Sequence, residues 1–418
     1  MNSALAALIG LVVAIALIIK KVSPFYSLML GAVTGGLLSG IGLVETVNQM
    51  LSGVKDITPA ILRILAAGVL SGALIKTGAA ASISQSVVKG LGQKHVYLAI
   101  AFSAMLLTGV GVFIDVAVIT VAPIALMLGK KLSISKAKLL LAMIAGGKCG
   151  NIISPNPNTI IAAENYNAAL PSVMGAGVIA AVIGLIFTVY VLLPLMPSSK
   201  AAVLDYDNDE TSEDQKLPSF LASMAGPLAS IILLALRPLC DVVIDPMIAL
   251  PIGGLVTILA TGSWKNTAQS LSFGLEKMTG VAILLVGTGA IAGIIKASEI
   301  KDVFIALLSG WEAGGVLMAP ISGALMSAAT ASTTAGATIA SASFSQTVLA
   351  SGVSAVWAAA MTNAGATILD HLPHGSFFHA TGGSVGMSIK ERMRLIPYES
   401  LVGLVLTLMS LLSYLLIS

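Results

Sequence analysis

Four ionisable residues stand within apolar stretches of the sequence: Asp115, Lys148, Asp370 and His371. A charged side chain at the centre of a membrane helix costs about 2.5–3.5 kcal/mol on insertion scales, so such residues mark substrate and ion pathways. We expect Asp115, Asp370 and His371 to carry a coupled proton, because carboxylates and imidazoles can take one up. Lys148 can offer a positive charge to a bound anion. The structural alternative is an ion pair of Lys148 with Asp115 or Glu164.

A run of prolines and small polar residues interrupts the apolar segment 144–164. Pro155 and Pro157 remove two backbone donors and push the residues before them out of helical geometry. The pattern predicts two half-helices joined by an unwound link, which a bilayer tolerates only where protein or a water-filled cavity satisfies the backbone. Discontinuous helices of this kind form binding sites in secondary transporters. The substrate-binding candidates in this link and beside it are Lys148, Asn151, Ser154, Asn156, Asn158 and Thr159.

Three further polar stretches interrupt apolar segments, at residues 108–123, 327–338 and 363–376. Helix N-termini in such breaks present free N–H groups and a positive dipole end, which suit a carboxylate, and hydroxyl and amide groups suit a polyol. Helix packing is the alternative for the serines and threonines, since small residues also serve that purpose in membranes. Glu399 is expected to be solvated at a helix end. The candidates in the second and third stretches are Thr330, Ser332, Thr333, Thr334, Asn363, His374 and Ser376.

The composition indicates an all-α polytopic membrane protein. Hydrophobic residues make up 56% of the 418 residues, charged residues only 10%, and the mean hydropathy is +0.98. A soluble fold of this size could not bury so much apolar surface. The two cysteines, Cys149 and Cys240, give neither a disulfide framework nor metal-ligand spacing. We therefore expect no cofactor and no metal, and the absence of a basic tail or an aromatic-basic patch argues against nucleic acid as a partner.

Apolar runs divide the chain into about ten membrane crossings. With the N-terminus outside, most of the 22 basic residues fall in cytoplasmic segments, as the positive-inside rule requires. Both termini are then external. Spans are expected near 60–78 and 278–295, among others. The expected organisation is an N-terminal span at 1–23, a first repeat at 24–196, a cytoplasmic linker at 197–217, a connecting span at 218–241 and a second repeat at 242–418. The first repeat contains a hairpin at 94–129 and a broken helix at 138–165. The second repeat contains a hairpin at 312–350 and a broken helix at 354–388.

The two repeats are expected to be inverted relative to each other. Leu65–Lys76 aligns with Leu285–Lys296, and the same sequence offset aligns the two hairpins and places the break at 154–158 near residues 371–376. An odd number of crossings separates equivalent elements, which reverses the orientation of the second copy. The lysine-rich segment after the first hairpin also has an uncharged counterpart after the second. The predicted fold is an inverted-repeat transporter with two re-entrant hairpins.

Three segments carry a resemblance to a known family. Gly111–Val116, Ser154–Glu164 and Ala364–Phe378 resemble, in order and spacing, motifs of the gluconate:proton symporter (gluconate permease) family within the ion transporter superfamily. The resemblance implies a bacterial inner-membrane symporter for sugar acids or related carboxylates, driven by protons, with a dimer built from a scaffold and a moving domain. Asn156, Asp370 and the pair Pro373-His374 depart from the family pattern at site positions. Citrate, other hydroxy acids or sugar acids, and D-amino acids therefore remain open as substrates.

The function predicted from these observations is proton-coupled symport of a gluconate-like acid or another small organic carboxylate by an elevator-type mechanism. A sodium-coupled citrate or dicarboxylate carrier is the first alternative, because Pro-Asn pairs also occur in the breaks of such carriers. A cation/proton antiporter would require acidic pairs in breaks that are dominated here by hydroxyls, amides and prolines. An enzyme would require a catalytic motif such as His-Glu-x-x-His, which does not occur. The expected partners are a small organic anion, a proton or sodium ion, the lipid bilayer and a second copy of the chain.

Overall fold

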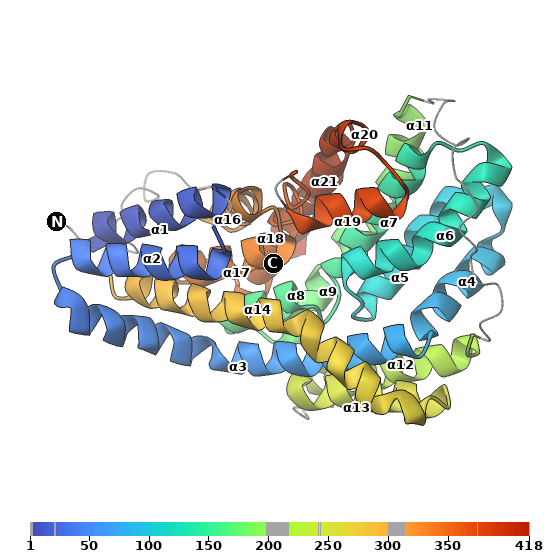
Figure 1. Cartoon of the computed structure of the whole chain (residues 1–418). Helices are drawn as coiled ribbons and strands as arrows, with labels where there is room; N and C mark the ends of the chain where they lie inside the picture. The colour runs from blue at the N-terminus through green and yellow to red at the C-terminus, as the bar shows by residue number, and fades with distance from the viewer. Residues whose placement is uncertain are drawn as a thin grey trace.

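The computed structural model shows a helical protein in which every regular element of the described residues is a helix (Figure 1). Most of the predicted linker at 197–217, and His374, lie outside the residues that the structure describes. The side chains of residues 19, 93, 235, 237–240 and 376 are also outside this description. The described residues are 3–20, 22–197, 217–240, 242, 244–299, 314–373 and 375–417.

The first half of the chain begins with two short helices and a long one and ends with an apolar helix that contains a π-helical turn, η2. Its elements are α1 (Ser3–Ile19), α2 (Pro24–Leu38), α3 (Gly42–Lys76), α4 (Ala79–Leu91), η1 (Gln93–His95), α5 (Val96–Gly109), α6 (Ile114–Leu132), α7 (Lys136–Asn151), α8 (Pro157–Asn165), α9 (Leu170–Ala176), α10 (Val178–Phe187), η2 (Thr188–Leu192) and α11 (Leu193–Leu195).

In the second half, as in the first, a long helix is followed by a pair of helices and then by an interrupted helix. Its elements are α12 (Phe220–Cys240), α13 (Pro246–Ala260), η4 (Trp264–Asn266), α14 (Thr267–Lys296), α16 (Gly314–Thr330), α17 (Thr333–Ala350), α18 (Ala355–Gly365), α19 (Ser376–Ser384), α20 (Ile389–Met393) and α21 (Ile396–Ile417).

Several helices have the length and hydropathy needed to cross a lipid bilayer. In the described part of the chain, four helical segments meet both criteria: Gly42–Lys76, Leu170–Leu195, Trp264–Lys296 and Ile389–Ile417. Large apolar side chains are also exposed along these segments, among them Leu62, Ile186 and Leu412. Such side chains suit contact with lipid tails. The protein is therefore an integral membrane protein, as its composition predicts.

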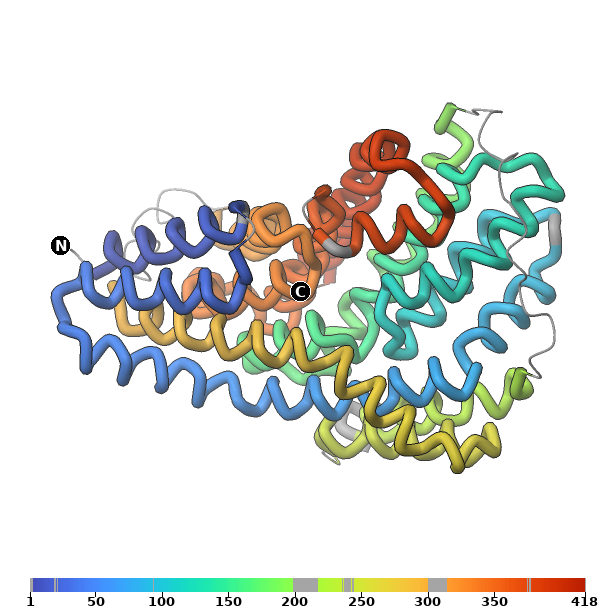
Figure 2. The backbone as a smooth tube through the Cα atoms, viewed as in Figure 1, coloured from blue at the N-terminus to red at the C-terminus, as the bar shows by residue number. Residues whose placement is uncertain are grey.

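The two long helices α3 and α14 lie side by side and run in opposite directions (Figure 2). Their glycines bring the backbones into close contact. A Cβ atom on Gly53 would lie 2.1 Å from the Gly289 carbonyl oxygen, and one on Gly72 would lie 2.2 Å from the Ser270 carbonyl oxygen. Because α3 and α14 contain the aligned segments Leu65–Lys76 and Leu285–Lys296, their antiparallel packing fits an inverted arrangement of two similar halves.

Both helices are longer than the apolar spans predicted near 60–78 and 278–295. Helix α3 begins at Gly42 and passes through Pro59, and α14 begins at Thr267. The apolar pattern in the first part of α3 is broken by charged residues such as Asp56, whose carboxylate pairs with Lys296 at 2.8 Å. Packing against α14 buries the other face of this part of α3 and extends the helix beyond its apolar run.

Two helix pairs and two interrupted helices build the centre of the molecule. α5 and α6 meet at a tight turn where Gly111 has a φ of +101°, and α16 and α17 meet at Ala331, with a φ of +46°. α7 and α8 are separated by residues 152–156, and α18 and α19 by residues 366–375. These interruptions fall where the polar stretches and prolines of the sequence lie.

Candidate functional site

A cavity of about 140 Å³ lies where the two helix pairs and the two interrupted helices meet. Polar side chains from both halves of the chain line it, together with the aromatic rings of Phe113 and Phe377. Residues that are more than 200 positions apart in the sequence therefore share one wall. The polar side chains that line the cavity belong to Asp115, Asn151, Asn156, Asn158, Ser332, Thr333, Thr334 and Asp370.

Four described helices begin at this cavity. Ile114 and Asp115 start α6, Pro157 and Asn158 start α8, Thr333 and Thr334 start α17, and Phe377 lies in the first turn of α19. The first turn of a helix has N–H groups without intrahelical partners, and it carries the positive end of the helix dipole. The arrangement therefore surrounds one small cavity with several sources of positive potential and hydrogen-bond donors.

Asparagine side chains connect the two interrupted helices behind the cavity wall. The Asn158 amide donates to Asn363 Oδ1 at 2.8 Å, and the Asn363 amide donates to Thr159 Oγ1 at 3.1 Å. Within the first break, the Asn156 amide donates to Asn151 Oδ1 at 2.8 Å. These residues are buried, so the hydrogen bonds fix the orientation of amide groups that line the cavity.

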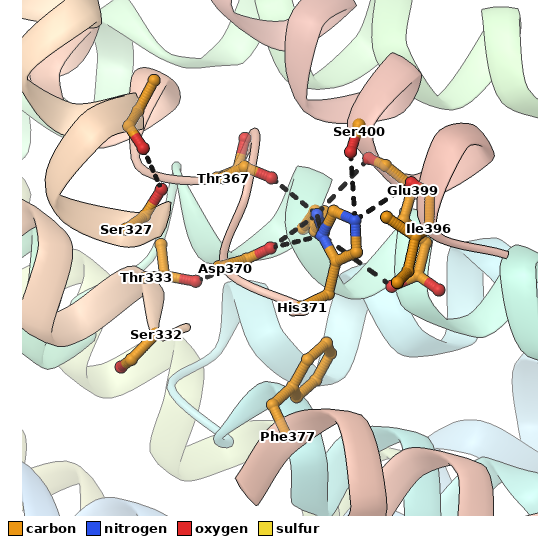
Figure 3. Close-up of polar contacts among 12 residues, drawn as sticks. Ser327, Ser332, Thr333, Thr367, Asp370, His371, Phe377, Ile396, Glu399 and Ser400 are labelled. Carbon is orange, nitrogen blue, oxygen red and sulfur yellow. Dashed lines mark hydrogen bonds and ion pairs between the residues drawn. The ribbon is translucent and has the colours of Figure 1, made fainter. Parts of the chain in front are cut away.

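Asp370 connects the cavity to a buried lysine. Its Oδ2 accepts a hydrogen bond from the Thr333 hydroxyl at 2.5 Å, and its Oδ1 lies 2.7 Å from Lys148 Nζ. The Lys148 side chain is fully buried and also donates to the Thr367 carbonyl oxygen at 2.6 Å. Figure 3 shows Thr333 and Asp370 pointing toward each other at the tip between α16 and α17. Lys148 therefore pairs with Asp370, and not with Asp115 or Glu164 as the structural alternative proposed.

His371 lies between this ion pair and the start of α21 (Figure 3). Its Nδ1 is 3.0 Å from both Lys148 Nζ and Asp370 Oδ1, and its Nε2 is 3.1 Å from the Ile396 carbonyl oxygen. Nε2 also lies 3.2 Å from the Ser400 hydroxyl, so this nitrogen either donates to the Ile396 carbonyl oxygen or accepts from Ser400. Nδ1 accepts from Lys148 when it carries no hydrogen and donates to Asp370 when it does.

A second buried ion pair stands behind His371. The Arg392 guanidinium contacts both carboxylate oxygens of Glu399, and the two side chains are 1% and 0% exposed. The expectation that Glu399 is solvated was therefore wrong: α20 folds Arg392 back onto the first turn of α21 and buries the pair. Sequence reasoning missed both residues as members of the site. The sequence feature that could have identified the pair is Glu399, because it is a charged residue within the apolar run that forms α21.

Asp115 lies at the cavity in the first turn of α6, partly exposed. Among the described residues, no hydrogen bond or ion pair joins its carboxylate to another side chain. The positive end of the α6 dipole stabilises this negative charge.

The remaining predicted residues lie behind the cavity or outside it. Lys148, Ser154, Thr159, Asn363 and His371 are buried around it and hydrogen-bonded to its walls or to the link. The Thr330 hydroxyl donates to the Met326 carbonyl oxygen of its own helix and does not line the cavity. His374 and the side chain of Ser376 lie outside the described residues. In the part of the chain that is described, no group of three His, Cys, Asp or Glu side chains could hold a metal ion.

Arg63 of α3 links three elements at the edge of this assembly. Its guanidinium contacts Glu164 at the end of α8, and its Nη2 lies 2.7 Å from Asp245 Oδ2 at the start of α13. The hydrogen bond from Arg63 lowers the pKa of the Asp245 carboxyl below its usual value. Because α8 belongs to an interrupted helix and α3 to the long antiparallel pair, this cluster joins the cavity-bearing elements to the long helices.

Comparisons with known proteins place the whole chain in one family. The family model for GntP family permease matches residues 3–418. An uncharacterized transporter of Haemophilus influenzae is 54% identical over 415 residues, covering 99% of this chain and 98% of the relative. A gluconate permease of Pseudomonas aeruginosa is 26% identical and covers 97% of this chain and 96% of its own.

The fold has a counterpart among solved structures. The crystal structure of the YdaH transporter of Alcanivorax borkumensis superimposes with a TM-score of 0.62 at 14% sequence identity. The match covers 90% of this chain and 89% of that one, so the likeness extends over nearly the whole fold. The match of the family model to residues 3–418 shows that the chain belongs to the GntP family of permeases.

Proposed function

We propose that this permease is a proton-coupled symporter for a gluconate-like sugar acid or another small organic monocarboxylate. The observation that carries the proposal is the convergence of four described helix N-termini on one small cavity with asparagine, serine and threonine side chains. The N–H groups suit a carboxylate, and the amides and hydroxyls suit a hydroxylated carbon chain. The names of relatives such as the gluconate permease of P. aeruginosa support the same class of substrate.

The charges at the cavity favour a substrate with a single negative charge. Two carboxylates, Asp115 and Asp370, are among the described lining residues, and no lining side chain in that set is cationic. Lys148 lies behind Asp370 and neutralises it. A tricarboxylate such as citrate would bring several negative charges close to Asp115, whereas one carboxylate can bind at the helix N-termini away from it. The sodium-coupled citrate carrier is therefore the second choice.

A proton is the coupling ion that the buried charges favour. Lys148 neutralises Asp370, and Arg392 neutralises Glu399, so this buried cluster has no net charge when His371 is neutral. A monocarboxylate bound beside it adds one negative charge, which is costly to move across the apolar core. One proton taken up at His371 Nδ1 or at Asp115 cancels that charge. We assign the proton to these two groups, with Asp370 as the acceptor for a protonated His371.

An elevator-type movement fits the division of the helices. In this proposal α2, α3, α13 and α14 form a scaffold, and the helix pairs with the interrupted helices carry the cavity past it. A homodimer formed by the scaffold, external N- and C-termini, a cytoplasmic segment at 197–217 and residence in a bacterial inner membrane complete the proposal. It also keeps the inverted repeats at 24–196 and 242–418 with re-entrant hairpins, which the antiparallel packing of α3 and α14 supports.

Uptake into proteoliposomes tests the proposal. Gluconate, glycerate, citrate and D-serine are offered under an imposed pH gradient or an imposed sodium gradient. We expect an inward proton gradient to drive accumulation of gluconate or glycerate, and a sodium gradient to have no effect. Uptake of citrate driven by sodium would favour the dicarboxylate-carrier alternative, and proton release in exchange for a cation without organic solute would favour an antiporter.

A matched pair of variants links the transport to the cavity. Thr334 lines the cavity, and Thr330 lies on the neighbouring helix with its hydroxyl bonded to its own backbone. Thr334→Val should raise the KM for the substrate about five- to tenfold, because a lost hydrogen bond to a charged or polar solute is worth about 1–1.5 kcal/mol. Thr330→Val should leave the KM unchanged. Equal effects of both substitutions would place the binding site elsewhere.

A further inference from the structure

The Lys148 ammonium is held by a set of ligands that resembles a site for a metal cation. Nζ lies 2.6 Å from the Thr367 carbonyl oxygen, 2.7 Å from Asp370 Oδ1 and 3.4 Å from the Glu399 carbonyl oxygen, with His371 Nδ1 at 3.0 Å. Lys148 comes from α7 in the first half of the chain, and every ligand comes from residues 367–399 in the second half. The side chain is fully buried, with no surface open to solvent.

The ligands are the kind that bind coupling ions in transporters with interrupted helices. Thr367 lies just beyond Gly365, the last residue of α18, where the negative end of that helix dipole points. Unwound carbonyls and the C-terminal ends of half-helices coordinate sodium ions or protons in such transporters, and a carboxylate oxygen is also a hard ligand. Here an ammonium group on a side chain fills the position.

The balance of buried charges leaves no place for an additional metal ion. Lys148 and Asp370 form one neutral pair, and Arg392 and Glu399 form another. A sodium ion added to this cluster would bring an uncompensated positive charge into a buried site, and an unpaired charge there is strongly destabilising. Sodium could bind only if the ammonium were gone.

We propose that Lys148 is a tethered substitute for a coupling cation and sets the ion specificity of this permease. The ammonium permanently holds the position between Thr367, Asp370 and Glu399 that a sodium ion would otherwise occupy, so binding and transport do not require sodium. Removal of the ammonium turns the position into a site for a monovalent cation. Only the role of this position as a coupling site rests on the proposed function; the binding of a cation there does not.

Thermal unfolding of the purified full-length protein in detergent, without substrate, tests this inference. Melting temperatures are measured in sodium chloride and in choline chloride at equal ionic strength, for wild type and for Lys148→Ser. Wild type should melt at the same temperature in both salts. Lys148→Ser should melt lower than wild type in choline, and sodium should raise its melting temperature in a saturable way, by roughly 3–5 °C well above the dissociation constant.

The double variant Lys148→Ser/Asp370→Asn is the matched control, because it lacks both the ammonium and the carboxylate ligand. It should fold and show no sodium effect. The inference is overturned if sodium stabilises wild type, if folded Lys148→Ser ignores sodium, or if the double variant responds as strongly as the single one. It is also overturned if Lys148→Ser fails to fold even in saturating sodium, since the ion then cannot replace the ammonium. Failure of uptake in the assay above leaves these melting temperatures unaffected, so the two proposals are tested separately.

Discussion

The Arg392–Glu399 pair allows a quantitative test of the buried charge cluster. Both side chains are almost completely buried, and Arg392 also lies 4.9 Å from the centre of the Phe378 ring and 3.2 Å from the Thr381 hydroxyl. Glu399→Gln removes the negative charge and leaves the guanidinium buried without compensation. Breaking a buried pair in this way costs about 3–5 kcal/mol, whereas replacing both partners by apolar residues is often neutral or stabilising. Arg392→Met/Glu399→Leu should therefore recover most of the lost stability.

Equilibrium unfolding in mixed detergent micelles with an increasing fraction of dodecyl sulfate, followed by tryptophan fluorescence, gives the free-energy differences. The exposed pair of Lys296 and Asp56, with side chains 65% and 51% exposed, provides the control. Asp56→Asn should change the free energy of unfolding by no more than about 1 kcal/mol. If Glu399→Gln is as mild as Asp56→Asn, or if the double variant is no more stable than the single one, the guanidinium has another source of compensation and our account of the cluster is wrong.

Three further predictions address other parts of the molecule. Asp115→Asn should abolish uptake driven by a pH gradient while leaving substrate exchange measurable, and unchanged pH dependence of uptake would remove Asp115 from the mechanism. The lowered pKa of Asp245 means that its pairing with Arg63 stabilises the protein above about pH 4 and is lost as pH falls through the lowered value, so the melting temperatures of wild type and Arg63→Gln should converge in acid. Gly146→Val should prevent folding, because a Cβ there would lie 1.8 Å from the Ala101 carbonyl oxygen, and Gly90→Ala, with open space, should fold normally as judged by gel filtration.

The sequence allowed the class, the family and the places of interruption to be predicted because each depends on local signals. The apolar composition determines the membrane environment, and Pro155 and Pro157 together disfavour a continuous helix through residues 152–157. The family followed from short motifs around Asp115, Asn156 and His371, and the match to the family model confirmed it. The division into domains and the roles of individual site residues remain predictions.

Other features depend on contacts that no local pattern reveals. In the sequence, Asp115 and Glu164 are both candidate ion-pair partners for Lys148. Lys148 instead pairs with Asp370, which is more than 200 residues away along the chain. Glu399 has the sequence pattern of a solvated helix end, but α20 turns back and covers it with Arg392. Thr330 and Thr333 belong to the same polar stretch of the sequence, but Thr330 lies on the other helix of the pair and donates its hydroxyl to its own backbone. In each case the folded arrangement decides which of several chemically similar residues forms an ion pair or lines the cavity.

The order of the charges from the cavity inward explains why so many ionisable groups are tolerated in one buried region. Asp370 faces the cavity and is neutralised by Lys148, His371 follows, and Glu399 is neutralised by Arg392 behind it. Each carboxylate has its own cation, so the cluster carries no net charge across the apolar core in its resting form. His371 Nδ1 is 3.0 Å from both Lys148 Nζ and Asp370 Oδ1, so the ring sits between the cation and the anion of the first pair. In the mechanism that we propose, a proton taken up at His371 Nδ1 or at Asp115 offsets the negative charge that a bound monocarboxylate adds to this region.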